Sequence, residues 1–148
     1  NYLGSRESAG TLVIQLVRAL VRDDLEAWRK SLTAFFASIP YSMRRKGDER
    51  ERERYFHYTF YLIFRILSTY LTLTELQQSE GRADCVVETD KGIYIFEFKL
   101  DGTAVEALQQ IEDKGYARAY VADARPVRKV GISFSSKTGT IDDWQVAP

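Results

Sequence analysis

The chain has 148 residues, the length of one ordinary domain, and its 45% hydrophobic and 28% charged residues exclude a disordered chain. Its 21 basic and 21 acidic residues give a formal net charge of zero, which argues against nonspecific coating of DNA through phosphate neutralisation. The single cysteine, Cys85, excludes an internal disulfide framework and a Cys-rich zinc site, and it fits a reducing compartment such as the cytoplasm.

Neither a membrane span nor a signal peptide is predicted. No apolar run is long enough to cross a bilayer, and the first eight residues lack the pattern of a secretory signal. We therefore expect no membrane partner. Because the chain does not begin with Met, we expect it to be a piece of a longer protein.

Two helices are predicted at the start of the chain. Apolar residues recur at helical spacing from residue 8 to residue 21, and a second helix follows Asp23 or Asp24 as its N-cap. Pro40 ends this second helix, because the residue before a proline avoids the helical region. We expect residues 1–47 to form a helical lead-in segment before a domain that covers residues 48–148.

A charge run separates the lead-in from a long helix predicted over residues 49–70, with Asp48 as its N-cap. Arg44, Arg45 and Lys46 in this run are either solvated or in contact with a polyanion. Glu53 lies near the polar start of the long helix and is expected to project toward a functional site. His57, one turn further on, is expected more as a packing residue than as a catalytic one.

The second half of the chain alternates between strand and helix patterns. Period-2 alternation and turn residues predict strands over residues 72–78, 84–88, 93–100, 129–134 and 140–146. A helix predicted over residues 103–118, weakened by Gly115, is long enough to make the strands on either side of it parallel. The expected fold class is α/β, with a mixed central sheet flanked by helices.

Three charged residues on the central hairpin predict a metal site. Asp84 opens one strand, and Glu97 and Lys99 share a face of the next, because side chains alternate along a strand. Mg²⁺ prefers oxygen ligands, so Asp84, Glu97 and the carbonyl of Phe98 are candidate ligands. Lys99 would hold an attacking water or stabilise the transition state of phosphodiester hydrolysis. The alternative is a structural salt bridge among Asp84, Glu97 and Lys99.

The sequence resembles the PD-(D/E)XK nuclease superfamily over about residues 50–146. The resemblance is closest to a bacterial branch in which this domain follows an AAA-type ATPase. The segments that carry the resemblance are 53–57, 81–84, 96–99, 107–111, 114–116 and 131–134. Ala83 stands where the family pattern has proline.

This resemblance implies a restriction-endonuclease-like core and assigns roles to individual residues. It implies that Asp84 and Glu97 bind the metal, that Lys99 is the catalytic lysine, and that Glu53 supports the metal from the first core helix. Gln110 and Tyr116 are similar to a Gln/Tyr pair found after the lysine, with Gln109 as the alternative glutamine.

The functions implied are of two kinds. The first is an enzyme, a Mg²⁺- or Mn²⁺-dependent nuclease that cuts DNA in preference to RNA, linked to an AAA-type ATPase domain and able to pair as a homodimer. The second is a noncatalytic module beside the ATPase that binds nucleic acid or protein. Metal binding distinguishes the two, because a working site gains thermal stability from its metal.

Overall fold

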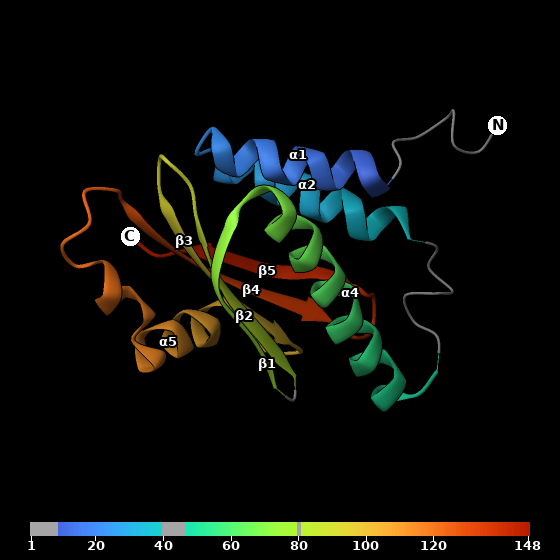
Figure 1. The fold of residues 1–148 in the computed structure, drawn as a ribbon. Coiled ribbons are helices and arrows are strands. Elements are labelled where there is room, and N and C mark those ends of the chain that lie inside the picture. The colour runs from blue at the N-terminus through green and yellow to red at the C-terminus, as the bar shows by residue number, and fades with distance from the viewer. Residues whose placement is uncertain (1–8, 40–46, 80) are drawn as a thin grey trace.

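The computed structural model describes residues 9–39, 47–79 and 81–148, which form a five-stranded mixed sheet with helices on both faces (Figure 1). The predicted α/β class is therefore confirmed. Arg44, Arg45 and Lys46 lie outside the described residues. The elements in chain order are α1 (Ala9–Val21), α2 (Leu25–Ser38), α4 (Glu49–Tyr70), β1 (Thr72–Ser79), β2 (Arg82–Glu88), β3 (Ile93–Leu100), α5 (Ala104–Lys114), the 3-10 helix η2 (Tyr116–Tyr120), β4 (Val127–Ser135) and β5 (Thr140–Val146).

The strands lie in the sheet in the order in which they occur in the chain, β1-β2-β3-β4-β5. Neighbouring strands are antiparallel except for β3 and β4, which are parallel and are joined through α5. A parallel pair needs such a crossover, so the predicted helical connection and the predicted parallel pairing are both confirmed.

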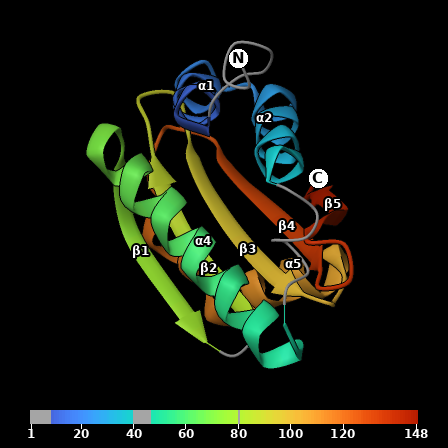
Figure 2. The ribbon, with the colours of Figure 1, turned by 90° about the vertical axis from the view of Figure 1, so that its right-hand side faces the viewer.

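One face of the sheet is covered by α1, α2 and α4, as the two ribbon views show together (Figures 1 and 2). The alternation along β3 turns Tyr94, Phe96 and Phe98 toward this face, where they join a large buried cluster. Trp28 of α2 stacks on Phe96 with ring centroids 4.4 Å apart, and Phe60 of α4 lies 4.5 Å from Phe98. Helices α1 and α2 therefore belong to the same core as the sheet.

Asp24 and Asp48 fix the starts of α2 and α4. The side chain of each accepts a hydrogen bond from a backbone N–H in the first turn, that of Ala27 and that of Glu51, respectively. The prediction that Asp48 caps α4 is confirmed. Of Asp23 and Asp24, the two residues expected as the N-cap of α2, Asp24 is the one that caps it. Within the described part of the chain, no helix is both long and apolar enough to cross a bilayer.

Helix α5 covers the opposite face of the sheet, and Gly131 of β4 allows it to approach closely. A Cβ atom at Gly131 would lie 2.4 Å from the carbonyl oxygen of Ala104. A smaller apolar cluster, made by Val86, Ile93, Ile95 and Ile111, lies under this helix. The face that α5 covers therefore has a small core, with room for polar side chains at its end.

The prediction of one helix over residues 103–118 is wrong at its C-terminal end. Helix α5 ends at Lys114, because Gly115 adopts a left-handed conformation with φ of 68° and closes the helix. The chain then continues as the short helix η2. Lys114 is therefore the last residue of α5, and its side chain is part of the candidate site.

Candidate active site

Asp84 and Glu97 lie directly opposite each other on β2 and β3, in the same pair of the antiparallel ladder. Both face the α5 side of the sheet, because their neighbours Ala83, Cys85, Phe96 and Phe98 point into the large core. The two acids are buried, with 1% and 0% of their surfaces exposed, respectively. The sheet thus brings together the two carboxylates that the sequence predicted.

Lys114 contacts both carboxylates. Its Nζ donates to Oε1 of Glu97 at 3.0 Å and to Oδ2 of Asp84. Sequence reasoning gave Lys114 no role and expected Lys99 to form any salt bridge here. A signal existed, since Lys114 continues the inward stripe of Ala107 and Ile111 on α5 at helical spacing.

One oxygen of each acid is left over. Oδ1 of Asp84 and Oε2 of Glu97 are buried and have no hydrogen-bond partner among the described residues. Buried carboxylate oxygens without partners are costly, and a divalent cation would satisfy them. The described residues contain no group of three His, Cys, Asp or Glu side chains that could hold a metal ion. Two carboxylates still fit Mg²⁺, which usually takes one or two from a protein and keeps several waters.

Phe98 follows Glu97 on β3 and pairs with Ala83 on β2 and with Ile132 on β4. The backbone N–H of Leu100 donates a hydrogen bond to the Gly81 carbonyl, so these two residues form a hydrogen-bonded pair of the β2–β3 ladder. Hydrogen-bonded pairs recur at every second residue of an antiparallel ladder, so Phe98 is also in such a pair and its carbonyl points toward β2. If the Phe98 carbonyl bound a metal, its oxygen would be shared between the metal and the hydrogen bonding of the sheet.

The electrostatics of the site follow from its burial. Burial raises the pKa of Glu97, the pairing with Lys114 opposes this only in part, and the resulting pKa is about 7. Burial alone would lower the pKa of Lys114, but its bonds to the two acids outweigh burial and raise it. Burial, and then the charge of Asp84, raise the pKa of Tyr116. Tyr116 therefore lies within the field of the acids.

Lys99 is on the same face of β3 as Glu97 and is half-buried. It forms no ion pair with a described residue, unlike Lys114. Gln110 is connected to this region through Arg82, whose Nη1 donates to Oε1 of Gln110 at 2.7 Å. Gln109 instead bonds to Asp113 on the helix surface, so Gln110 is the glutamine that faces the site.

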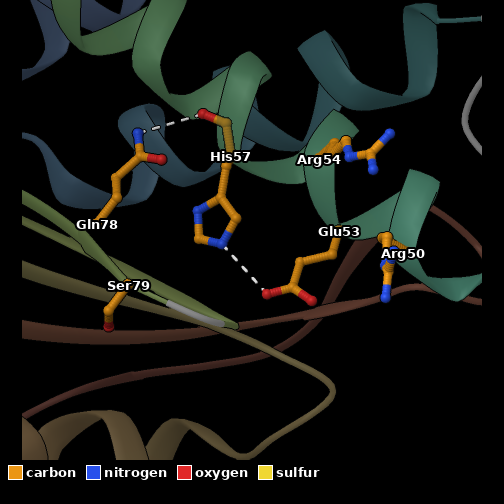
Figure 3. A pocket seen from close by; sticks show the side chains of 6 residues that line it. All are labelled: Arg50, Glu53, Arg54, His57, Gln78 and Ser79. Carbon is orange, nitrogen blue, oxygen red and sulfur yellow. Dashed lines mark hydrogen bonds and ion pairs between the residues drawn. The ribbon is translucent and has the colours of Figure 1, made fainter.

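Glu53 is placed apart from the other predicted site residues. Its Oε1 accepts a hydrogen bond from Gly81 N at 2.7 Å, at the turn between β1 and β2, and lies 3.5 Å from Nε2 of His57. Figure 3 shows Glu53 and His57 projecting from α4 toward Gln78 and Ser79 at the end of β1. Glu53 thus holds the turn that leads into Asp84 and does not contact Asp84 itself.

Two neighbouring cavities surround the end of β1. One, of about 420 Å³, is open and is lined by Arg50, Glu53, Arg54, His57, Gln78 and Ser79 (Figure 3). The other, of about 130 Å³, reaches Asp84 and is lined by Gln77, Gln78, Ser79, Arg82, Ala83, Asp84 and Lys114. The two cavities share Gln78 and Ser79, so they lie side by side along β1.

The mixed sheet, its flanking helices and the opposed acids define an α/β protein with a restriction-endonuclease-like fold. The chain belongs to the PD-(D/E)XK nuclease superfamily, whose sequence profile matches residues 51–144. It is similar to a curated protein of Azotobacter chroococcum mcd 1, described as an uncharacterized protein in the vnfD 5' region, with 36% identity over 129 residues. The match covers 86% of this chain and 25% of that protein, so the chain spans about a quarter of its relative's length. No solved structure matches the chain.

Proposed function

We propose that this chain is a Mg²⁺- or Mn²⁺-dependent nuclease that hydrolyses phosphodiester bonds in nucleic acid, with DNA as the preferred substrate. One observation carries the proposal: two buried carboxylates face each other across β2 and β3, and each has an oxygen with no hydrogen-bond partner in the part of the chain that the structure describes. Burying two carboxylates destabilises a fold unless they are paired or bind a metal. Membership of a nuclease superfamily supports the same chemistry.

In this proposal Asp84, Glu97 and the carbonyl of Phe98 bind the metal. A bound divalent cation lowers the pKa of a water molecule and neutralises charge on the phosphate oxygens. The ammonium of Lys99, on the same face as Glu97, holds the attacking water or stabilises the charge of the transition state. Tyr116 and Gln110 orient Lys99 and the attacking water, and Gln110 does so through its bond to Arg82.

Glu53 acts indirectly in this scheme. Its bond to Gly81 N holds the turn three residues before Asp84, which keeps the start of β2 in register with β3. We therefore propose Glu53 as a positioning residue, with a role in metal support only through water. Its loss should lower activity less than the loss of Asp84.

The open cavity beside the acids is the proposed path of the nucleic acid. Arg50 and Arg54 line this cavity and form no hydrogen bond or ion pair with a described residue. Unpaired guanidinium groups suit phosphate oxygens, and they give a locally basic rim to a chain of zero net charge. Gln78 and Ser79, which line both cavities, connect this rim to Asp84.

Two further parts of the proposal concern partners and location. We propose that the chain works in the cytoplasm beside an AAA-type ATPase domain and that two copies pair. The greater length of the Azotobacter relative leaves room for a further domain. Pairing would cover apolar side chains exposed along α4, which are Tyr58, Tyr61, Leu62, Ile66 and Tyr70.

A cleavage panel tests the enzyme directly. The purified chain is incubated with linear, circular, single-stranded and branched DNA and with RNA, in Mg²⁺, Mn²⁺ or EDTA. We expect metal-dependent cutting that falls by about 100-fold or more in Asp84→Asn and Glu97→Gln, because each removes a charged ligand. Glu112→Gln, which changes an exposed acid of α5, is the matched control. Unchanged cutting by Asp84→Asn would overturn the proposed site.

The second candidate is a noncatalytic binding module. The contact of Lys114 with both acids favours it, because a closed salt bridge needs no metal. In that case neither Mg²⁺ nor Mn²⁺ at millimolar concentration would raise the melting temperature, and no substrate would be cut. A rise in melting temperature that Asp84→Asn abolishes would favour the enzyme.

A further inference from the structure

We infer that the ammonium of Lys114, which contacts the second oxygen of each acid, lies so close to the proposed metal position that it must leave before the metal binds and thereby sets the metal affinity. This inference rests on the proposed metal site at Asp84 and Glu97. It gives a role to a residue that the proposed reaction does not use. It also explains how two buried acids are held together before metal arrives.

The position of Nζ is that of a bridging cation. It contacts one oxygen of each carboxylate, and those oxygens belong to residues that are paired across two strands. A metal held by the same two acids would lie within a few ångströms of that Nζ, since Mg²⁺ binds oxygen at about 2.0–2.1 Å. Two cations so close together, at a site shielded from water, repel each other strongly. Lys114 and the metal therefore exclude each other.

Lys114 can leave the acids without moving the backbone. Its side chain is 23% exposed, whereas Asp84 and Glu97 are almost fully buried. The side chain lines the cavity of about 130 Å³ together with Arg82 and Ser79, so a change of rotamer moves the ammonium away from the acids. The flexible four-carbon stem of lysine suits such a movement.

Lys99 does not share this role. It lies on the same face as Glu97 but forms no ion pair with a described residue, so among the described residues the ion pairs of the two acids are made by Lys114. The site thus contains two lysines with different tasks. Lys114 competes with the metal, and Lys99 remains available to the reaction.

Binding of Mn²⁺ alone, without nucleic acid, tests the inference. The affinity of the 148-residue chain is measured by isothermal titration calorimetry and by the loss of the free Mn²⁺ signal in electron paramagnetic resonance. We expect Lys114→Met to bind Mn²⁺ about tenfold more tightly than the wild type, because a positive charge has left the site. Lys129→Met removes another lysine that pairs with an acid, Glu112 of α5, and should leave the affinity unchanged.

A second neutral variant covers the case in which Lys114→Met does not fold. Lys114→Gln removes the charge but retains a group that donates hydrogen bonds to the acids. It should also bind Mn²⁺ more tightly, whereas Lys114→Arg, which retains the charge, should not. A folded neutral variant with wild-type or weaker affinity would overturn the inference.

The experiment separates this inference from the proposed function. If the wild type binds Mn²⁺, Asp84→Asn abolishes binding, and the neutral Lys114 variants gain nothing, the metal site stands and the inference fails. If neither the wild type nor any Lys114 variant binds Mn²⁺, the metal site itself is wrong and both fail. Binding by the neutral variants alone would support the inference in its strongest form.

Discussion

At the scale of single residues, Glu97 is a carboxylic acid placed in the interior of the protein. It is fully buried in the middle of the sheet, next to a second acid, and one lysine compensates for it only in part. Burial therefore raises the pKa of Glu97 from its usual 4.5 to about 7. The folded chain holds a proton on this carboxyl in a pH range in which the unfolded chain has released it.

This difference predicts a pH dependence of stability. Between about pH 4.5 and pH 7 the unfolded state binds fewer protons than the native state, so the contribution of Glu97 falls as pH rises. The contribution is complete below the unfolded pKa and is lost once the pH passes the folded pKa. We expect it to reach roughly 3 kcal/mol, and Glu97→Gln, which cannot ionise, to lack this fall. Urea unfolding in EDTA at several pH values measures the difference between the two proteins.

The comparison with Glu97→Gln removes the effect of the titrating groups that lie away from Glu97, since they are the same in both proteins. Glu112→Gln is the control, because Glu112 is exposed and pairs with Lys129 away from the site. The stability of Glu112→Gln should fall with rising pH as that of the wild type does. Equal pH slopes in the wild type and in Glu97→Gln would show that Glu97 ionises normally in the folded chain.

At the scale of elements, the close contact between α5 and β4 positions Lys114 over the acids. Gly131 pairs with Glu97 on the neighbouring strand, and a Cβ atom there would clash with the backbone carbonyl of Ala104. Backbone cannot move aside as a flexible side chain does. The helix lies where it does because Gly131 has no side chain.

We therefore predict that Gly131→Ala shifts α5 and destabilises the fold by about 1–3 kcal/mol, the usual cost of overpacking. Gly102→Ala, just before the N-cap of the same helix, is the matched control. The nearest atoms to its Cβ would be side-chain atoms of Lys99 and Glu106, at 3.3 Å or more, so the loss should be much smaller. Chemical denaturation of the two variants provides the comparison, and equal losses would contradict the close-packing argument.

The sequence predicted the central hairpin well because its signals are local. Alternation along β3 separates Phe96 and Phe98 from Glu97 and Lys99, and the structure confirms that the two sets face opposite sides. The partners of these residues could not be predicted in the same way. Helical spacing places Lys114 on the inward face of α5, but only the packing of α5 against the sheet brings that face over the acids.

The contacts of Glu53 could not be predicted from local sequence signals either. Helical spacing indicated the face of α4 on which Glu53 lies, but not which strand end that face would meet. In the structure the face meets the β1–β2 turn, so Glu53 binds Gly81 and not Asp84 or Glu97. The roles of Glu53, Lys99, Gln110 and Tyr116 in catalysis remain predictions.

At the scale of the whole molecule, helices α1 and α2 are packed as part of the nuclease-like core. Trp28 stacks on Phe96 from β3, and Asp23 accepts hydrogen bonds from Arg128 of β4 and from Tyr94 of β3. Residues predicted as a lead-in segment thus cover the strand that carries Glu97. We propose that the segment and the sheet unfold together as one cooperative unit, with no independent domain boundary at residue 47.

Native-state hydrogen exchange on Trp28→Ala tests this proposal. Removing a fully buried tryptophan should cost about 3–5 kcal/mol of stability. In a single cooperative unit the amides of β3 lose as much protection as those of α2, because both exchange through the same global unfolding. Val121→Ala, which shortens an exposed side chain, should change neither. Protection lost in α1 and α2 alone, with β3 unchanged, would show that the helices unfold separately and that the strands that carry Asp84 and Glu97 are stable without them.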